Sequence, residues 1–528
     1  MKKITAIILA AVMVLTLTAC GKSKEASYDV TNYSNYNAKP DATLVYEAKT
    51  VASDELIMEE PMAMPEFNTE EYNEIVENSF VKVSTMPLST FAADVDTGSY
   101  TNFRRMVLGD NYQLGQIPSG AVRIEEMVNY FDYSVNNKSQ GAFSVQYETA
   151  ACPWNPEHGL LMMTVEANKK EVDNKGNNFV YLVDTSGSMR SANKIDLVKE
   201  SFKLLTESLN ENDTVSIVTY ASNARVVLEG AGGNNQKKII KAIESLEVGG
   251  GTNGSGGIEG AYKCALEHFI EGGNNRVIIA SDGDMNLGVT SQSGLVDLIK
   301  EKKDQGVFLT TLGFGAGNYS DANMERIADA GNGNYYYIDC IGEERRVLVE
   351  KLKETTVTVA KDVKFQVEFN PTKVSEYRLL GYENRTMAAD DFNDDKKDGG
   401  EVGAGQQVTV LYELVYADGE NSSSGLKYQG DRELTTAADP EEILTLSVRY
   451  KQPDGDVSAL EEYPVEMTYD APSDDLMFAA AVVEAALVIN NSEYKGTASL
   501  EHAKESAKES AGKNDYRTEF CTILNRLN

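Results

Sequence analysis

Histidine and tryptophan are scarce in this sequence: its 528 residues include three histidines and one tryptophan. Common hydrolase motifs are absent, because neither G-x-S-x-G nor H-E-x-x-H occurs. There is also no G-x-x-x-x-G-K-[ST] loop, and no G-x-G-x-x-G follows the first strand of the predicted α/β segment. These absences argue against nucleotide-binding folds and familiar hydrolases. A hydrolase that uses Mg²⁺-activated water and a carboxylate base would need none of these motifs, so it stays as an alternative.

Basic residues are also few. The chain has 49 Lys and Arg against 82 Asp and Glu, which gives a net charge of −33. Because the chain is strongly negative, it is repelled by nucleic acids and by anionic lipid surfaces. No nucleic-acid partner is therefore expected. An acidic surface suits a soluble extracellular protein and concentrates divalent cations.

Cysteine is sparse, with five residues and no C-x-x-C pair. This spacing is poor for a metal site. Four cysteines follow the first one, and outside the cytoplasm they allow three disulfide pairings, among which the sequence does not choose. Buried free thiols are the simpler expectation for this set: Cys152, Cys264, Cys340 and Cys521.

The N-terminus has the pattern of an export signal. Lys2 and Lys3 precede an apolar run over 4–17 that is too short to span a bilayer. The following Leu-Thr-Ala-Cys, ending at Cys20, resembles the bacterial lipobox. The resemblance implies cleavage before Cys20, acylation of its sulfur, and an extracytoplasmic protein anchored by lipid to the bacterial cell membrane. Ordinary secretion without a lipid is the alternative. We therefore expect a signal peptide over 1–20 and, from composition, a flexible tether over 21–85.

The rest of the chain divides by its periodicity. Helices and strands are expected over 86–175, strand–helix alternation over 176–357, a β-rich region over 358–472 and helices over 473–528. Alternating strands near 143–149 and 160–167 match the later strands at 363–369, 407–415 and 443–450. We expect these to form one β-sandwich, so that the α/β segment is an insertion in it.

The α/β segment opens with an apolar run, Phe179 to Val183, that predicts a buried parallel strand. Asp184, Ser186 and Ser188 follow it in a small polar turn. The carboxyl end of such a strand is where open α/β sheets bind ligands, and three oxygen donors suit a hard divalent cation.

Two further short loops lie next to predicted helices or strands of the same α/β segment. Gly250-Gly251-Thr252 precedes a predicted helix, and Asp282-Gly283 follows a second buried strand, Arg276 to Ser281. The three loops together resemble the metal-ion-dependent adhesion site of the von Willebrand factor type A family. This resemblance implies a Rossmann-like domain: a parallel sheet with one antiparallel edge strand, near Ala224–Glu229, and helices on both faces.

The resemblance also implies the ligands and the mode of binding. Ser186 and Ser188 would coordinate Mg²⁺ directly, with Mn²⁺ or Ca²⁺ as alternatives. Thr252 would bind directly or through water, and Asp184 and Asp282 would hold coordinating waters. A protein ligand with an exposed Asp or Glu would complete the coordination. Two alternatives are an envelope scaffold whose metal only stabilises the fold and, less favoured, a metal-dependent hydrolase.

Three stretches are similar to a subfamily of bacterial von Willebrand A lipoproteins with an added N-terminal domain and a C-terminal domain of unknown function. They are residues 89–100, 122–132 and 381–398. This likeness defines architecture and leaves the molecular activity open.

Other motifs have plainer interpretations. Asp96-Thr97-Gly98-Ser99 matches the turn of aspartic proteases, but those need two such aspartates. Helix capping by Thr97 or Ser99 is favoured instead. The acidic segment 390–398 has Lys396 and Val402 where an EF-hand needs Gly and Glu, so a solvated hairpin tip is favoured over a looser calcium loop. The apolar helix at 475–489 contains Glu484 and is predicted to pack in a core.

Overall fold

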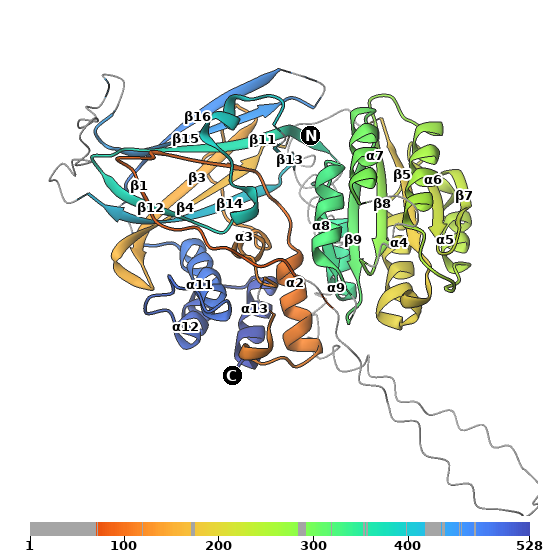
Figure 1. Cartoon of the computed structure of the whole chain (residues 1–528), viewed down its shortest axis with the longest axis horizontal. Helices are drawn as coiled ribbons and strands as arrows, with labels where there is room; N and C mark the ends of the chain where they lie inside the picture. Colours follow the sequence, from red (N-terminus) through yellow and green to blue (C-terminus); the bar gives the residue numbers. More distant parts are fainter. Residues whose placement is uncertain are drawn as a thin grey trace, which may run out of the picture. The chain divides into compact units, whose positions relative to one another are not determined.

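The computed structural model describes residues 70–528 except 71, 119, 170–174, 284–291, 318, 352–353, 355–356, 398, 418–434, 436–438, 454, 456 and 469–470. Its α/β domain is built on a six-stranded sheet with the order β10-β9-β8-β5-β6-β7 (Figure 1). All neighbours in this sheet pair in parallel except β7, which is antiparallel to β6 at one edge. The predicted fold class is confirmed. The strands are β5 (Asn177–Asp184), β6 (Thr214–Tyr220), β7 (Ala224–Gly232), β8 (Asn274–Ser281), β9 (Phe308–Phe314) and β10 (Tyr335–Ile338).

Helices cover both faces of this sheet because its central strands are apolar on both sides. In β5, Phe179, Tyr181 and Val183 belong to one hydrophobic cluster, whereas Val180 and Leu182 belong to the other. The first cluster includes side chains from α4 (Leu197–Glu207) and α5 (Gln236–Glu244). The second includes side chains from α6 (Gly254–Glu267), α7 (Gln292–Asp304) and α8 (Asp321–Ala330). The domain closes with α9 (Ile341–Arg345) and a π-helical turn, η7 (Arg346–Glu350).

Two antiparallel sheets form the β-sandwich. The first has the order β1-β12-β14-β4-β3, and the second has the order β13-β11-β15-β16 with β2 paired to β11. One hydrophobic cluster contains side chains from both sheets. The strands of the first sheet are β1 (Val81–Lys82), β12 (Val374–Leu380), β14 (Gln407–Tyr416), β4 (Asn155–Ala167) and β3 (Phe143–Cys152); those of the second are β2 (Leu88–Ala92), β11 (Thr358–Phe369), β13 (Gly400–Gly403), β15 (Glu442–Lys451) and β16 (Ser458–Glu466).

The α/β domain is an insertion in this sandwich. Strand β4 precedes the domain and β14 follows it, yet the two are adjacent, with Val165 opposite Val408. The expectation that the strands near 143–167 share a sandwich with those after residue 358 is thereby confirmed. The segment 86–175 contributes strands to both sheets of the sandwich in addition to its helices.

A helical layer packs beside the sandwich. It consists of helices before and after the inserted domain, which share one hydrophobic cluster. The apolar helix predicted at 475–489 is at its centre, with Glu484 1% exposed. None of the described helices is long and apolar enough to cross a bilayer. The helices of this layer are α2 (Gly98–Arg104), α3 (Ile124–Asn129), α11 (Asp474–Ile489), α12 (Leu500–Ser510) and α13 (Asp515–Arg526).

The predicted tether ends earlier than residue 85, which corrects the expected boundary. Strand β1 pairs with β12, and Val83 is 1% exposed within the sandwich core. Upstream, Glu70 forms an ion pair with Arg105 at 3.0 Å. Apolar burial and sheet pairing, which the polar composition of 21–85 concealed, hold this part of the segment on the fold.

Candidate metal site at the carboxyl edge of the inserted sheet

The first predicted loop begins where β5 ends. Asp184 is fully buried, and its Oδ1 accepts a hydrogen bond of 2.8 Å from the backbone N–H of Ser186. Ser186 is buried and Ser188 is exposed, and their hydroxyl oxygens lie 2.9 Å apart. This turn therefore places two hydroxyls side by side, one on a buried and one on an exposed serine, next to a buried carboxylate.

The glycine loop before α6 is held against this turn. The backbone N–H of Gly249 donates to the carbonyl of Thr185 at 2.8 Å, and that of Gly187 donates to the carbonyl of Gly250 at 3.2 Å. Gly250 has φ +91°, a left-handed conformation that favours glycine. Thr252, half-buried, follows in the same loop. The structure thus brings the second predicted loop beside the first.

The third loop follows β8. The hydroxyl of Ser281 donates to Asp184 Oδ2 at 3.2 Å, and the next residue, Asp282, is fully buried. The Nζ atom of Lys194 forms an ion pair of 2.9 Å with Asp282 Oδ2. Sequence reasoning missed Lys194, which lies between the first loop and α4 and whose side chain is only 6% exposed. No local pattern marks this lysine, because its partner lies 88 residues away.

Burial shapes the electrostatics of the site. It raises the pKa of the Asp184 carboxyl to about 6, with a smaller contribution from the nearby charge of Asp282, against hydrogen bonds from Ser186 and Ser281 that lower it. Buried carboxylates of this kind are held ionised by a neighbouring cation. At this edge Lys194 supplies one positive charge.

The donor set fits a hard divalent cation. Nowhere in the described ranges do three His, Cys, Asp or Glu side chains gather closely enough to hold a metal. The predicted site is of another kind, since Ser186, Ser188 and Thr252 offer hydroxyl oxygens and only Asp184 and Asp282 are carboxylates. Such oxygen donors are those that Mg²⁺ and Ca²⁺ take in proteins.

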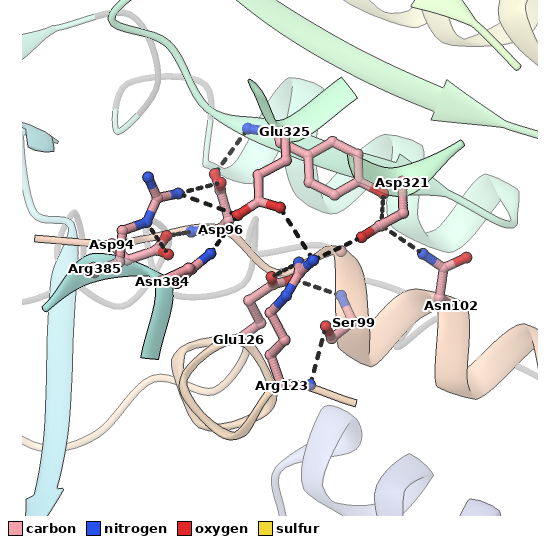
Figure 2. A network of polar contacts seen from close by, with 12 residues as sticks. Asp94, Asp96, Ser99, Asn102, Arg123, Glu126, Asp321, Glu325, Asn384 and Arg385 are labelled. Atoms are coloured by element: carbon pink, nitrogen blue, oxygen red, sulfur yellow. Dashed lines mark hydrogen bonds and ion pairs between the residues drawn. The ribbon is translucent and has the colours of Figure 1, made fainter. Parts of the chain in front are cut away.

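A second polar cluster joins the inserted domain to the rest of the chain (Figure 2). Arg123, at the start of α3, pairs with Glu126 at 2.5 Å and with Asp321 and Glu325 of α8 at 3.1 Å each. Arg385 pairs with Asp94 at 2.7 Å and Asp329 at 2.9 Å. It also lies 3.5 Å from Asp96 and from Glu325. We call these eight residues the arginine–carboxylate cluster.

The Asp96-Thr97-Gly98-Ser99 motif belongs to this contact, and its interpretation as a helix cap is wrong. Thr97 occupies the N-cap of α2 without a side-chain hydrogen bond to the helix. Asp96 Oδ1 instead accepts from the backbone N–H of Tyr335, and the Ser99 hydroxyl accepts from the N–H of Arg123. These residues hold β10 of the inserted domain and α3 in place.

In the acidic segment 390–398, Asp395 accepts hydrogen bonds from Arg449 at 2.9 Å and from Ser458 at 2.6 Å, so this carboxylate is used within the sandwich. Cys20 lies outside the described residues. The four described cysteines are all free thiols: Cys152, Cys264, Cys340 and Cys521.

Comparison with known proteins agrees with this architecture. A model described as von Willebrand factor matches residues 66–162, the von Willebrand factor type A domain matches 178–345, and the C-terminal domain of "uncharacterized protein YfbK" matches 354–528. The protein described as uncharacterized protein YfbK from Escherichia coli (strain K12) is 40% identical over 468 residues, which are 86% of this chain and 80% of that protein.

Two solved structures are similar to parts of this chain. A von Willebrand factor type A protein from Catenulispora acidiphila has 15% identity and a TM-score of 0.43, and the match covers 74% of this chain and 91% of that chain. Proximal thread matrix protein 1 of the mussel byssus, with a zinc-occupied MIDAS motif, has 21% identity and a TM-score of 0.28 and covers 34% of this chain and 46% of that chain.

The inserted sheet, its three edge loops and the family-model matches define a von Willebrand factor type A protein, a class whose domains commonly carry a metal-ion-dependent adhesion site and mediate protein interaction. Within this class, the chain belongs to the family of the Escherichia coli protein YfbK.

Proposed function

We propose that this protein binds a protein partner through a Mg²⁺-dependent site formed by Asp184, Ser186, Ser188, Thr252 and Asp282. The observation that carries the proposal is the convergence of three loops at one sheet edge, linked by the bonds from Gly249 to Thr185 and from Ser281 to Asp184. A bound divalent cation supplies an electrophilic centre with a coordination position open to an outside ligand.

The chain's own residues suit this task. The exposed hydroxyl of Ser188 marks the side from which a partner approaches, whereas Asp184 and Asp282 lie beneath it. Neutral hydroxyls as direct ligands leave much of the cation's charge uncompensated. A carboxylate from an exposed Asp or Glu of the partner is then the complementary group.

A binding role is favoured over catalysis by the placement of the histidines. His158 pairs with Glu413 at 2.6 Å, His268 lies 3.6 Å from Glu229, and His502 pairs with Glu484 at 2.7 Å. These carboxylates belong neither to the three loops nor to the arginine–carboxylate cluster. No histidine pairing therefore supports a proton-transfer role at the metal site.

The test is a capture experiment with the full chain and Asp184→Asn, which keeps the shape of the side chain and removes its charge. Envelope proteins are presented to each immobilised chain in Mg²⁺ and in EDTA, and bound proteins are identified. We expect a partner retained only by the unchanged chain in Mg²⁺, and lost when one of the partner's own surface carboxylates is changed to an amide. Identical capture by both chains, or in EDTA, would exclude this mode of binding.

Asp184→Asn also distinguishes a metal-dependent binding protein from an envelope scaffold and from a hydrolase. If the metal served only to stabilise the fold, Mg²⁺ would raise the melting temperature of the unchanged chain, but no captured protein would depend on the metal. A hydrolase would instead show Mg²⁺-dependent turnover that Asp184→Asn abolishes.

We also propose that Cys20 carries a lipid and holds the protein on the outer side of the bacterial cell membrane. The support is the export pattern at residues 1–20. Fractionation of cells that express the chain or Cys20→Ala tests it. We expect the unchanged chain in the membrane fraction and the variant outside it; equal membrane retention would contradict lipid anchoring.

A further inference from the structure

The cluster between the inserted domain and the rest of the chain contains more carboxylates than its arginines can balance. Six different carboxylates lie within 3.5 Å of the two guanidinium groups. One of them, Glu325, lies between Arg123 and Arg385 and faces both (Figure 2). Both arginines are therefore fully engaged. They are not free to neutralise any further acid in their surroundings.

Glu125 is a further acid at this place. It lies in α3, between Arg123 and Glu126, and is only 1% exposed. Neither of its carboxylate oxygens has a hydrogen-bond partner. Gly381 packs so closely that a Cβ atom there would lie 2.6 Å from Glu125 Oε2. A buried carboxylate with both oxygens unsatisfied is rare, because the desolvation of such a group is costly.

A cavity of about 240 Å³ adjoins Glu125. Its lining contains two more acids, Glu74 and Glu383, and two carboxamides, Asn73 and Asn384. The rest of the lining is Arg123, Ile75 and Val76. The Nδ2 atom of Asn384 donates to Glu325 at 2.7 Å, which commits the nitrogen side of this amide to the cluster. Glu125 and Glu383 line the same cavity, and the charge of Glu383 raises the pKa of the Glu125 carboxyl further, after the larger effect of burial. Three acids therefore line the cavity with one arginine, and that arginine is already paired with Glu126, Asp321 and Glu325, so the cavity keeps excess negative charge.

We propose that this cavity is a calcium site, separate from the metal site of the inserted domain, with Glu125 and Glu383 as its charged ligands. Ca²⁺ accepts six to eight oxygen ligands in flexible geometry, including carboxamides and water. Mg²⁺ is less suited, because it requires near-octahedral geometry and gives up its waters reluctantly. With two carboxylates, the site resembles in charge the weak calcium sites of extracellular modules, whose dissociation constants are about 10⁻⁴–10⁻³ M.

Occupancy would connect three separate stretches of the chain. Glu125 lies on α3, Glu383 lies on the turn η8 (Glu383–Arg385) after β12, and Asn73 belongs to the N-terminal segment. Arg123 and Arg385 flank these ligands and hold α8 of the inserted domain. The bound ion would therefore brace the junction through which the inserted domain contacts the rest of the protein.

Calorimetric titration with CaCl₂ tests the site. The full chain carries Asp184→Asn throughout, so that the adhesion-type site does not contribute. We expect this chain to bind one Ca²⁺, and a tenfold excess of Mg²⁺ to leave the binding in place. Adding Glu125→Gln, which keeps size and hydrogen-bonding atoms, should weaken the binding at least tenfold. A matched control, Glu368→Gln at an exposed position of β11, should leave the binding unchanged.

Several results would overturn the assignment. They are no Ca²⁺ binding by the Asp184→Asn chain, equal binding with and without Glu125→Gln, or displacement of Ca²⁺ by Mg²⁺. The first two would indicate that Glu125 is simply protonated. If circular dichroism shows that the Glu125→Gln chain is unfolded, Glu383→Gln on the half-buried turn takes its place and should produce the same tenfold loss.

Discussion

The Oδ1 atom of Asp96 accepts a 2.8 Å hydrogen bond from the backbone N–H of Tyr335, at the start of the last strand of the inserted domain. Both residues are buried. The contact spans 239 positions of the chain and lies at the join between the inserted domain and the loop that connects β2 to α2. The contribution of this join to the free energy of unfolding can be measured with single substitutions.

Gly98 should not tolerate a side chain. A Cβ atom there would lie 2.3 Å from a ring carbon of Tyr335, which is fully buried and whose hydroxyl donates a hydrogen bond to Asp321. We expect Gly98→Ala to lower the free energy of unfolding by about 1–3 kcal/mol, as overpacking does in other cores. Urea titration measures this. Gly115→Ala, where nothing lies within 4 Å of the added carbon, should be near neutral. Equal effects of the two would contradict the packing account.

Arg385 should be important for stability. Replacement by Met leaves three buried carboxylates, those of Asp94, Asp96 and Glu325, and one exposed carboxylate without their shared guanidinium. Breaking buried pairs of this kind costs about 3–5 kcal/mol, because the remaining charges stay desolvated. The unfolding free energy at pH 7 measures the loss. Arg225→Met, at an exposed position of β7, is the control and should change stability by less than about 0.5 kcal/mol. A loss no larger than that of the control would show that the cluster is unimportant for folding.

Glu344 should make stability depend on pH. It is 1% exposed, and burial raises its pKa from 4.5 to about 8. The folded chain therefore holds a proton that the unfolded chain releases, and the free energy of unfolding falls as pH rises from 4.5 towards 8. Glu344→Gln removes this proton-binding group and with it the pH dependence that Glu344 gives to the free energy of unfolding.

We expect Glu344→Gln to match the unchanged chain near pH 4.5 and to be more stable by about 1–3 kcal/mol at pH 8. Unfolding titrations at several pH values measure the difference. Glu247→Gln, at an exposed position, should keep the original slope. A constant difference between the Glu344 variant and the unchanged chain at all pH values would mean that Glu344 is ionised in the folded state.

Lys194 should contribute more to the stability of the protein when no metal is bound than when a metal is bound. Its ammonium group pairs with the fully buried Asp282, and a divalent cation at the same edge provides positive charge as well. Lys194→Met should therefore destabilise the protein in EDTA by about 3–5 kcal/mol, and by clearly less in Mg²⁺. Melting curves in the two solutions measure this. Lys203→Met, which removes a surface pair, should have a small effect that is equal in both. Equal losses for Lys194→Met in EDTA and Mg²⁺ would indicate that no metal shares the site.

The parts of the fold that the sequence predicts are those with a local signature. The run from Phe179 to Val183 is apolar at every position because β5 is covered on both faces, and this places the central strand and its following loop. The turn at Asp184–Ser188 and the loop at Gly250–Thr252 are likewise short and local. The structure brings these stretches together at one edge, as parallel strands require.

The rest depends on contacts between distant positions. Lys194 and Asp282 are 88 residues apart, and Arg123 and Asp321 are 198 apart. Nothing in the composition around Arg123 distinguishes a buried arginine from a solvated one. The same holds for Val83, which stands between Lys82 and Ser84 in the sequence and becomes part of the core because the adjoining strand β1 pairs with β12.

The adjacency of β4 and β14 sets an order of events for a newly made chain. Strand β4 can pair with β3 as soon as both have emerged, but its other edge stays open until β14 follows, since Glu166 pairs with Gln407. During that interval the whole α/β domain must be synthesised, and it has its own complete sheet and can fold first. The sandwich is then closed last, around a domain already formed, and the exposed edge of β4 is the place where a chain interrupted during synthesis or export would aggregate.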